Sequence, residues 1–162
     1  MVLGTAAPVL RNSATMTARE TIAIASDHAG FELKAILKQE LQELGFGVLD
    51  LGTETSASVD YPDYGRAAAR AIADGRVARG VIVCGTGIGI SIAANREPKV
   101  RAALCHDVSS ARLARQHNDA NVLAMGARLI GVETARDCLR AFLATEFEGG
   151  RHRSRVAKLS EP

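Results

Sequence analysis

Two different periods of apolar residues alternate along the chain from Thr21 onward. Short apolar runs typical of strands lie at residues 21–26, 48–51, 80–84, 100–105 and 121–124. Between them, apolar residues recur every three or four positions, the spacing of one helix face, at residues 30–44, 64–74, 90–95, 108–116 and 132–145. The charged tail at 148–159 is also expected to be helical. This alternation predicts an α/β fold, a Rossmann-like three-layer sandwich with a parallel sheet of about five strands.

The first 20 residues do not share this periodicity. They have mixed polarity and lack the basic start and the apolar core of a secretory signal. We therefore expect residues 1–20 to be a disordered leader, with Met16 as an alternative start, and residues 21–162 to form a single domain.

Composition narrows the partners and the compartment. Aromatic residues make up only 4% of the chain, so the core must be built from Ala, Val, Ile and Leu. The net charge of +2 does not indicate a nucleic-acid or membrane partner, and no apolar run approaches the roughly 20 residues of a membrane-spanning helix. The three cysteines are odd in number and far apart, which disfavours a disulfide framework and favours the cytoplasm. No CxxC or His/Cys cluster has zinc spacing, so no structural metal is expected.

Ligands in such folds bind beyond the carboxyl ends of the strands. Three segments are expected there: Ser26-Asp27-His28, the loop from Cys84 to Gly89, and the region before Asn121. A helix cap with Asp27 at the N-cap explains the first segment about as well as a functional role.

The loop Cys84-Gly85-Thr86-Gly87-Ile88-Gly89 is the strongest local signal, because it follows an apolar strand and opens a helix. Its glycines bring backbone N–H groups close to a ligand, which suits an anion. The loop has neither GxGxxG spacing nor the lysine of a phosphate-binding P-loop, so a dinucleotide site is disfavoured. A plain tight turn stays open as the alternative.

The chemistry-bearing side chains also have ordinary explanations. Cys84 is either a small buried hydrophobe or a thiolate acting as nucleophile or general base, and Cys105 also ends a strand, so position alone does not decide. Cys138 fits a helix core. His117-Asn118-Asp119 suits a turn at a helix end. The tail residues form either a solvated face or a phosphate clamp: Arg151, His152, Arg153 and Arg155.

Taken together, these parts match aldose–ketose isomerisation through an enediolate. That reaction needs a base to move a proton between C1 and C2, donors for the developing oxyanion, an acid to open the sugar ring, and cations for the phosphate.

Five motifs in order give the chain a specific resemblance: SDHAGFELK, DYPDY, CGTGIGISIAANR, RQHNDANVLAMGAR and FEGGRHRSRV. Residues 21–160 resemble the type B ribose-5-phosphate isomerases, a family that also holds the galactose-6-phosphate isomerase subunits. The resemblance implies interconversion of D-ribose 5-phosphate and D-ribulose 5-phosphate in the pentose phosphate pathway, without metal or cofactor.

The resemblance also implies roles for individual residues. Cys84 resembles the general base, Thr86 the hydroxyl that assists it, and His117 the acid that opens the ring. The remaining residues resemble the substrate-binding set: the loop backbone of Gly85, Gly87, Ile88 and Gly89 for the enediolate, Asp27 and Asn118 for sugar oxygens, His28, Arg128, Arg151 and Arg155 for the phosphate, and Tyr61 lining the site. One branch of the family replaces the cysteine by a glutamate further along the loop. Ser91 stands at that position here, so the chain resembles the cysteine branch.

Family members are dimers or tetramers whose sites are completed by a neighbouring subunit, so we expect His117 and Asn118 to face a site other than that of their own Cys84. Three alternatives to the pentose-phosphate isomerase stay open. They are an isomerase of a hexose 6-phosphate such as allose or galactose 6-phosphate, a sugar-phosphate-binding domain without turnover, and, least favoured, a dinucleotide-binding module.

Overall fold

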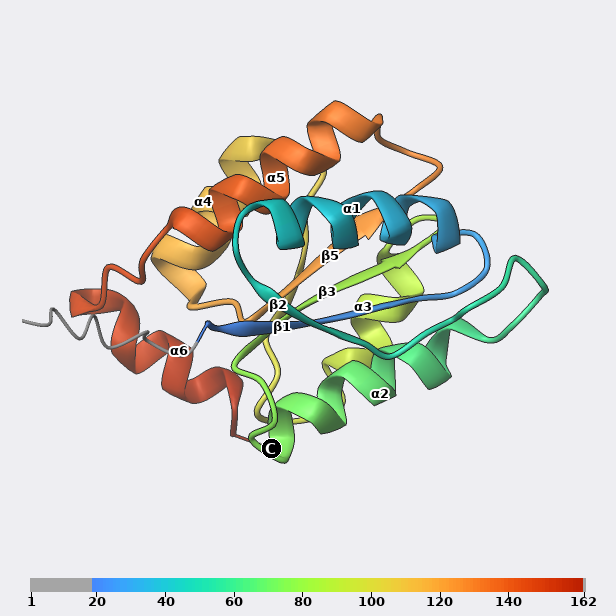
Figure 1. Ribbon diagram of the computed structural model, residues 1–162. Coiled ribbons are helices and arrows are strands. Elements are labelled where there is room, and N and C mark those ends of the chain that lie inside the picture. The colour runs from blue at the N-terminus through green and yellow to red at the C-terminus, as the bar shows by residue number, and fades with distance from the viewer. Residues whose placement is uncertain (1–18, 162) are drawn as a thin grey trace, which may run out of the picture.

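A five-stranded parallel sheet lies at the centre of the molecule, which the computed structural model describes from residue 19 to residue 161 (Figure 1). The strands are β1 (Thr21–Ser26), β2 (Gly47–Asp50), β3 (Arg79–Cys84), β4 (Ala102–Leu104) and β5 (Val122–Gly126). The helices are α1 (Phe31–Glu43), α2 (Tyr61–Ala73), α3 (Ile88–Ala94), α4 (Val108–Asn118), α5 (Val132–Ala144) and α6 (Arg153–Leu159), with a short 3-10 helix, η1 (Gly150–His152), before α6.

The strand order is β2-β1-β3-β5-β4, and every neighbouring pair is parallel. Helices α1, α4 and α5 cover one face of the sheet, while α2 and α3 cover the other (Figure 1). The expected α/β three-layer sandwich is therefore confirmed.

Two apolar cores hold the layers together, because successive strand side chains point to opposite faces. Ile24 belongs to the core under α1, α4 and α5, and the preceding Ala23 to the core under α2 and α3. Small residues let α2 and α3 approach closely. A Cβ added to Gly65 in α2 would lie 2.8 Å from the carbonyl oxygen of Ile90 in α3.

Element boundaries differ from the sequence prediction where special residues stand. Helix α2 begins at Tyr61 rather than at residue 64. Pro62 is tolerated in the first helical turn, because backbone N–H groups there make no hydrogen bond within the helix and proline lacks only that group. The tail forms η1 and then α6 rather than one helix, and Gly149 and Gly150, where η1 begins, both have positive φ. Strand β4 is shorter than the run at 100–105, and β5 extends to Gly126.

The expectation that the region before Asn121 lies at the carboxyl edge of the sheet is wrong. Asn121 directly precedes β5, and its carbonyl oxygen accepts the N–H of Gly80 at the start of β3, at 2.9 Å. Because all the strands are parallel, residues that precede a strand lie at the amino edge.

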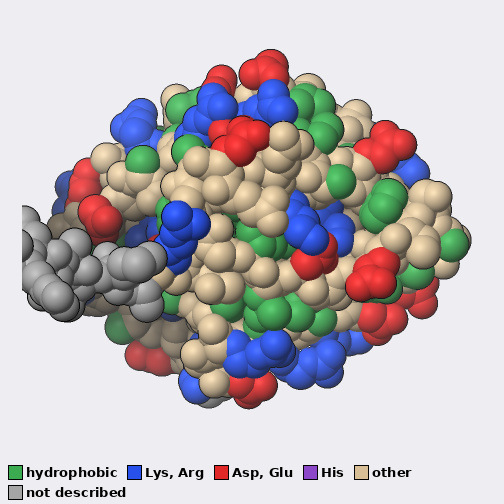
Figure 2. All heavy atoms as spheres, in the orientation of Figure 1, with side chains coloured by type: hydrophobic (Ala, Val, Ile, Leu, Met, Phe, Trp, Pro, Cys, Tyr) green, Lys and Arg blue, Asp and Glu red, His purple; other side chains and the backbone are tan. Residues whose placement is uncertain are grey.

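The leader was expected at residues 1–20, and residues 1–18 lie outside the described part of the chain. Glu20, directly before β1, pairs with Arg79 at 2.6 Å. Among residues 19–161, no helix has both the length and the apolar character needed to cross a membrane. Positive and negative side chains are interspersed on the face shown in Figure 2.

Candidate active site

A cleft of about 460 Å³ opens at the carboxyl edge of the sheet, which is the right-hand end in Figure 1. It lies where the chain order reverses, since β1 is flanked by β2 on one side and by β3 on the other. Parallel α/β sheets bind ligands at such switch points. The lining residues are Asp27, His28, Ala29, Tyr61, Cys84, Gly85, Thr86, Ile88, Gly89, Ile92 and Arg128.

The turn that follows β1 contributes Asp27 and His28. The Asp27 carboxylate is buried, and its Oδ1 accepts the N–H of Gly30 at 3.1 Å, which fixes the turn leading into α1. The Nδ1 atom of His28 lies 3.2 Å from both the backbone nitrogen and the backbone oxygen of Val59. With Nδ1 held in this way, Nε2 is the ring nitrogen available to a ligand in the cleft.

Strand β3 ends in the thiol of Cys84, which is only 4% exposed. The N–H of Gly87 donates to its Sγ at 3.1 Å, an interaction that stabilises negative charge on the sulfur. Gly87 has φ +76°, and a Cβ there would lie 2.5 Å from Leu104 and 2.8 Å from the backbone of Met125. Only glycine therefore allows the loop to fold back onto the thiol.

Thr86 is exposed on the same loop, and its Oγ1 accepts the N–H of Ile88 at 3.2 Å. Behind the loop, a Cβ on Gly126 of β5 would lie 2.6 Å from the Thr86 backbone. The close approach of β5 thus sets the position of the Thr86 hydroxyl relative to the Cys84 thiol.

Arg128 brings a positive charge to this loop. The N–H groups of Ala127 and Arg128 donate to the carbonyl oxygens of Cys84 and Gly85, both at 2.9 Å. The guanidinium lies against Gly85, since a Cβ there would be 3.1 Å from its Nη1. A thiol, a hydroxyl, loop amides and a cation therefore meet at the end of β3.

Tyr61 closes another side of the cleft from the first turn of α2. Its ring lies so near Gly89 that a Cβ there would be 2.5 Å from the ring carbons. The cleft thus unites Tyr61 and Arg128 with the predicted residues that follow β1 and β3, except for Gly87, which is buried and does not line it.

The remaining predicted residues lie at the opposite edge. His117 and Asn118 end α4, and Arg151 and Arg155 are exposed on η1 and α6, at the left in Figure 1. Asn121 lies beside Gly80 at the start of β3, whereas Cys84 ends that strand, so His117 and Asn118, which end α4 before β5, lie at the other edge of the sheet from the thiol. Asn118 lines a separate cleft with Asn95, Ala102 and Leu159, among others.

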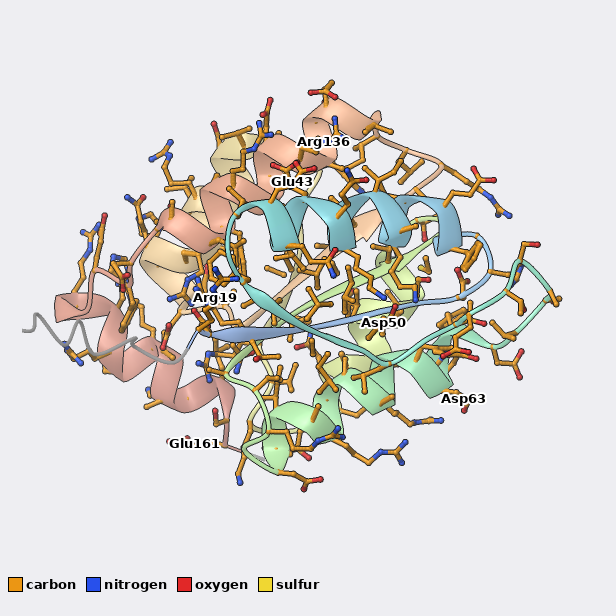
Figure 3. All side chains as sticks on the ribbon, viewed as in Figure 1. Arg19, Glu43, Asp50, Asp63, Arg136 and Glu161 are labelled. Atoms are coloured by element: carbon orange, nitrogen blue, oxygen red, sulfur yellow. The ribbon has the colours of Figure 1, made fainter. Side chains whose placement is uncertain are left out.

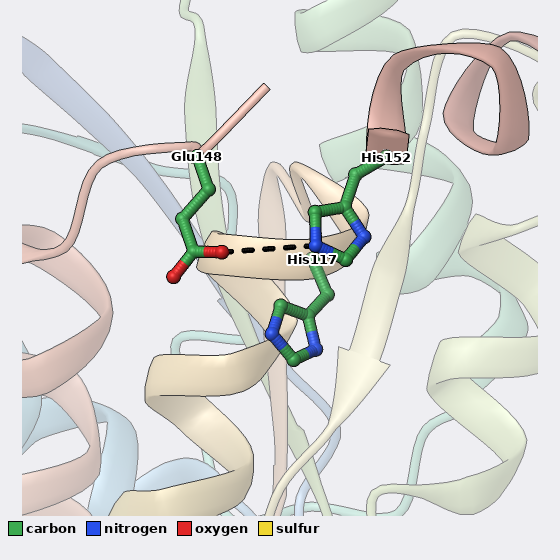
Figure 4. Close-up of side chains that lie close together, drawn as sticks. All are labelled: His117, Glu148 and His152. Carbon is green, nitrogen blue, oxygen red and sulfur yellow. Dashed lines mark ion pairs between the residues drawn. The ribbon is translucent and has the colours of Figure 1, made fainter. Parts of the chain in front are cut away.

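His117 is in contact with the tail. Its ring stacks on that of His152, with centroids 4.5 Å apart and planes 14° apart. The Nε2 of His152 lies 3.7 Å from the Glu148 carboxylate (Figure 4). Burial lowers the pKa of His152, and the positive charge of a protonated His117 lowers it further.

Cys105 and Cys138 differ from Cys84. Both belong to the core under α4 and α5 and are fully enclosed. Burial raises the pKa of the Cys105 thiol, and it raises that of Cys138 to about 11. These two thiols stay protonated at neutral pH, and Cys138 is a core residue as predicted.

Sequence reasoning missed Ala29 and Ile92, which line the cleft. Both are apolar, Ala29 in the turn before α1 and Ile92 within α3, so their residue type gave no functional signal. It also missed that Glu148 and His152 meet His117, because 31 residues separate Glu148 from His117 and only the folded chain brings them together.

The fold and the cleft define an α/β protein whose candidate ligand site lies at the switch point of a parallel sheet. Residues 22–159 match the family described as Ribose/Galactose Isomerase. Ribose-5-phosphate isomerase B of Escherichia coli is 48% identical over 139 residues, which are 86% of this chain and 93% of that protein. D-erythrulose-4-phosphate isomerase of Pectobacterium atrosepticum is 44% identical over 140 residues, 86% of this chain and 92% of that one.

Among solved structures, a ribose 5-phosphate isomerase of Thermotoga maritima superimposes with a TM-score of 0.86 at 50% identity, covering 88% of this chain and 99% of that one. The chain therefore belongs to the ribose/galactose isomerase family, and the resemblance of its motifs is confirmed. By family it is a sugar-phosphate isomerase.

Proposed function

We propose that this chain interconverts D-ribose 5-phosphate and D-ribulose 5-phosphate through an enediolate, with Cys84 as the base. The observation that carries the proposal is the Gly87 N–H aimed at the Cys84 Sγ at 3.1 Å, in a cleft that also holds Thr86 and Arg128. The relatives named as ribose-5-phosphate isomerases support the substrate.

In this mechanism the Cys84 thiolate takes the proton from C2 of the open-chain aldose and returns it to C1. The C2–H electron pair forms the C1=C2 bond of the enediolate and the carbonyl pair moves onto O1, where negative charge develops. In the net reaction the proton of the O2 hydroxyl passes to O1 as the C2 carbonyl forms. We propose that the Thr86 hydroxyl and the backbone of the loop Gly85–Gly89 stabilise that charge. Within this loop the N–H of Gly87 donates to Cys84 and that of Ile88 to Thr86, so these two act through the thiol and the hydroxyl. Asp27 contacts the sugar hydroxyls, while His28 and Arg128 bind the polar end of the substrate and Tyr61 excludes water.

His117 is proposed as the acid that opens the furanose ring, with Asn118 beside it on the sugar and with Arg151 and Arg155 on the phosphate. These four residues lie at the amino edge, away from the cleft of their own chain. We therefore propose a homodimer in which the amino edge of one subunit completes the cleft of the other, and a two-fold interface would complete both sites at once.

The test is turnover of ribose 5-phosphate with a chelator present, in wild type and in Cys84→Ala. We expect a loss of at least about 100-fold in kcat, because general acid–base catalysis contributes that much or more. Cys105→Ala, which changes a buried thiol outside the cleft, serves as control and should keep its turnover. Full activity in Cys84→Ala with an unchanged circular dichroism spectrum would exclude Cys84 as the base.

The same assay tests the substrate, since one relative is named as a D-erythrulose-4-phosphate isomerase. We expect kcat/KM to be higher for ribose 5-phosphate than for erythrulose 4-phosphate or for allose or galactose 6-phosphate. A higher value for any of the others would reassign the substrate and keep the chemistry. Binding of ribose 5-phosphate without formation of ketose would support a binding domain.

A further inference from the structure

A cluster of metal-ligating side chains lies outside the cleft, at the end of α4. His117, Glu148 and His152 each offer a ligand atom, and these atoms lie within 4.8 Å of one another (Figure 4). His152 is 6% exposed, His117 is half-buried, and Glu148 reaches the cluster from the surface.

The backbone holds the three side chains in place. The N–H of Glu148 donates to the carbonyl oxygen of Gln116 at 3.1 Å, which fastens the tail to the last turn of α4. Gly149 and Gly150 then turn the chain with φ of +66° and +54°, and the N–H of His152 closes the turn on the Gly149 oxygen at 3.0 Å. This turn directs both Glu148 and His152 toward His117.

We propose that His117, Glu148 and His152 form a binding site for a divalent transition metal of the zinc type. Two imidazoles and one carboxylate are a ligand set that Zn²⁺ accepts while keeping a fourth position open. Hard cations such as Mg²⁺ prefer oxygen ligands and are not expected to bind.

Coordination requires a small rearrangement. The ligand atoms must approach to about 3.3 Å from one another, the spacing around a tetrahedral zinc ion with bonds near 2.0 Å. The two rings are nearly parallel, so one must turn about its terminal torsion to direct its lone pair at the ion, and that torsion is soft for histidine. The positive charges of Arg151 and Arg155 lie near His152 and repel a cation bound there. We therefore expect micromolar affinity.

Occupancy has a functional consequence that rests on the proposed function. A metal on His117 takes the nitrogen lone pair that proton transfer to the ring oxygen requires. Zinc is thus expected to inhibit the isomerase reversibly.

Binding is tested on the untagged full-length chain by titrating Zn²⁺ against a chromophoric chelator of micromolar affinity. We expect one Zn²⁺ per chain in wild type and in Cys84→Ala, and at least about 10-fold weaker binding in His152→Gln and in Glu148→Gln. His106→Gln removes a histidine outside the cluster and should bind like wild type. The site would be overturned if wild type bound no Zn²⁺ at roughly 100 μM, which is 100-fold above the expected micromolar dissociation constant. Equal Zn²⁺ affinity in all variants would also overturn it.

Inhibition is tested separately by adding Zn²⁺ to the isomerase assay and then restoring activity with chelator. Glu148→Gln should need at least about 10-fold more Zn²⁺ for the same inhibition. Unchanged turnover at saturating Zn²⁺ would refute the block on His117. If the chain turned over no sugar phosphate, the binding titration would still decide the site, so the two proposals fail independently.

Discussion

The three cysteines show how strongly the surroundings determine the chemistry of one residue type. Cys84 lines a cleft and accepts a hydrogen bond from the N–H of Gly87. Cys105 and Cys138 are enclosed among apolar side chains that raise the pKa of both thiols. In the sequence both Cys84 and Cys105 end a predicted strand, so their position does not distinguish them. Only the glycine-rich loop that follows Cys84 indicated which cysteine lies at a ligand site.

A buried ion pair allows a prediction for single residues. Lys34 of α1 is almost fully buried and pairs with Asp50 at 2.6 Å, while the more exposed Lys38 pairs with the other carboxylate oxygen at 3.0 Å. Figure 3 shows Asp50 beneath α1. Burial raises the pKa of Asp50, but hydrogen bonds from Lys34, the Gly52 amide and Lys38 outweigh it and leave the pKa below the ordinary 3.8.

Asp50→Asn leaves the Lys34 charge buried without its partner, so we expect the free energy of unfolding at pH 7 to fall by about 2–4 kcal/mol. Lys38→Met, the control at an exposed position, should cost less than about 1 kcal/mol. Urea unfolding measures both. The folded-state pKa is depressed, so the contribution is fully present above pH 3.8 and is lost as the pH falls through the lowered value. If the difference in the free energy of unfolding between wild type and Asp50→Asn did not shrink in acid, the stabilising role of the ionised Asp50 would be contradicted.

At the scale of elements, α6 is attached to the rest of the molecule more loosely than the other helices. None of its residues is buried, whereas α1 to α5 each bury several. Its arginines are therefore not there to build the core. The sequence predicted a charged helical tail, but only the structure showed it at the amino edge of the sheet.

A chain ending at Glu148 tests the tail. We expect it to stay folded, with a melting midpoint within about 4 °C of wild type, because the loss of a weakly packed helix costs about 1 kcal/mol or less. Turnover should nevertheless be lost with Arg151 and Arg155. Circular dichroism and the isomerase assay measure the two effects, and a chain ending at Leu159 is the control. Full turnover of the shorter chain would remove the tail from the proposed site.

At the scale of the whole molecule, the proposed machinery is divided between two edges of one sheet. The Cys84 cleft lies at the carboxyl edge, and His117 lies with the tail at the amino edge. Parallel strands cannot bring their two ends together, so a single chain does not unite these groups.

Mixing two inactive variants tests the shared site. If subunits exchange, Cys84→Ala and His117→Ala refolded together should recover roughly one quarter of wild-type turnover, since half of the dimers are mixed and each mixed dimer has one intact site. Each variant refolded alone is the control. No recovery, although mixed dimers are demonstrated by mass spectrometry, would place a complete site within one subunit.

The sequence by itself determined the local structure and the cleft loop. The alternating periods placed the five strands and α1 to α5, because each of these elements must bury one face, and the glycine loop after β3 was visible because only glycine permits its conformation. It could not place His117 or the tail, since residues before and after a strand look alike in sequence but lie at opposite edges of a parallel sheet. Nor could it show that His117, Glu148 and His152 meet. Those contacts arise only when packing brings distant segments together.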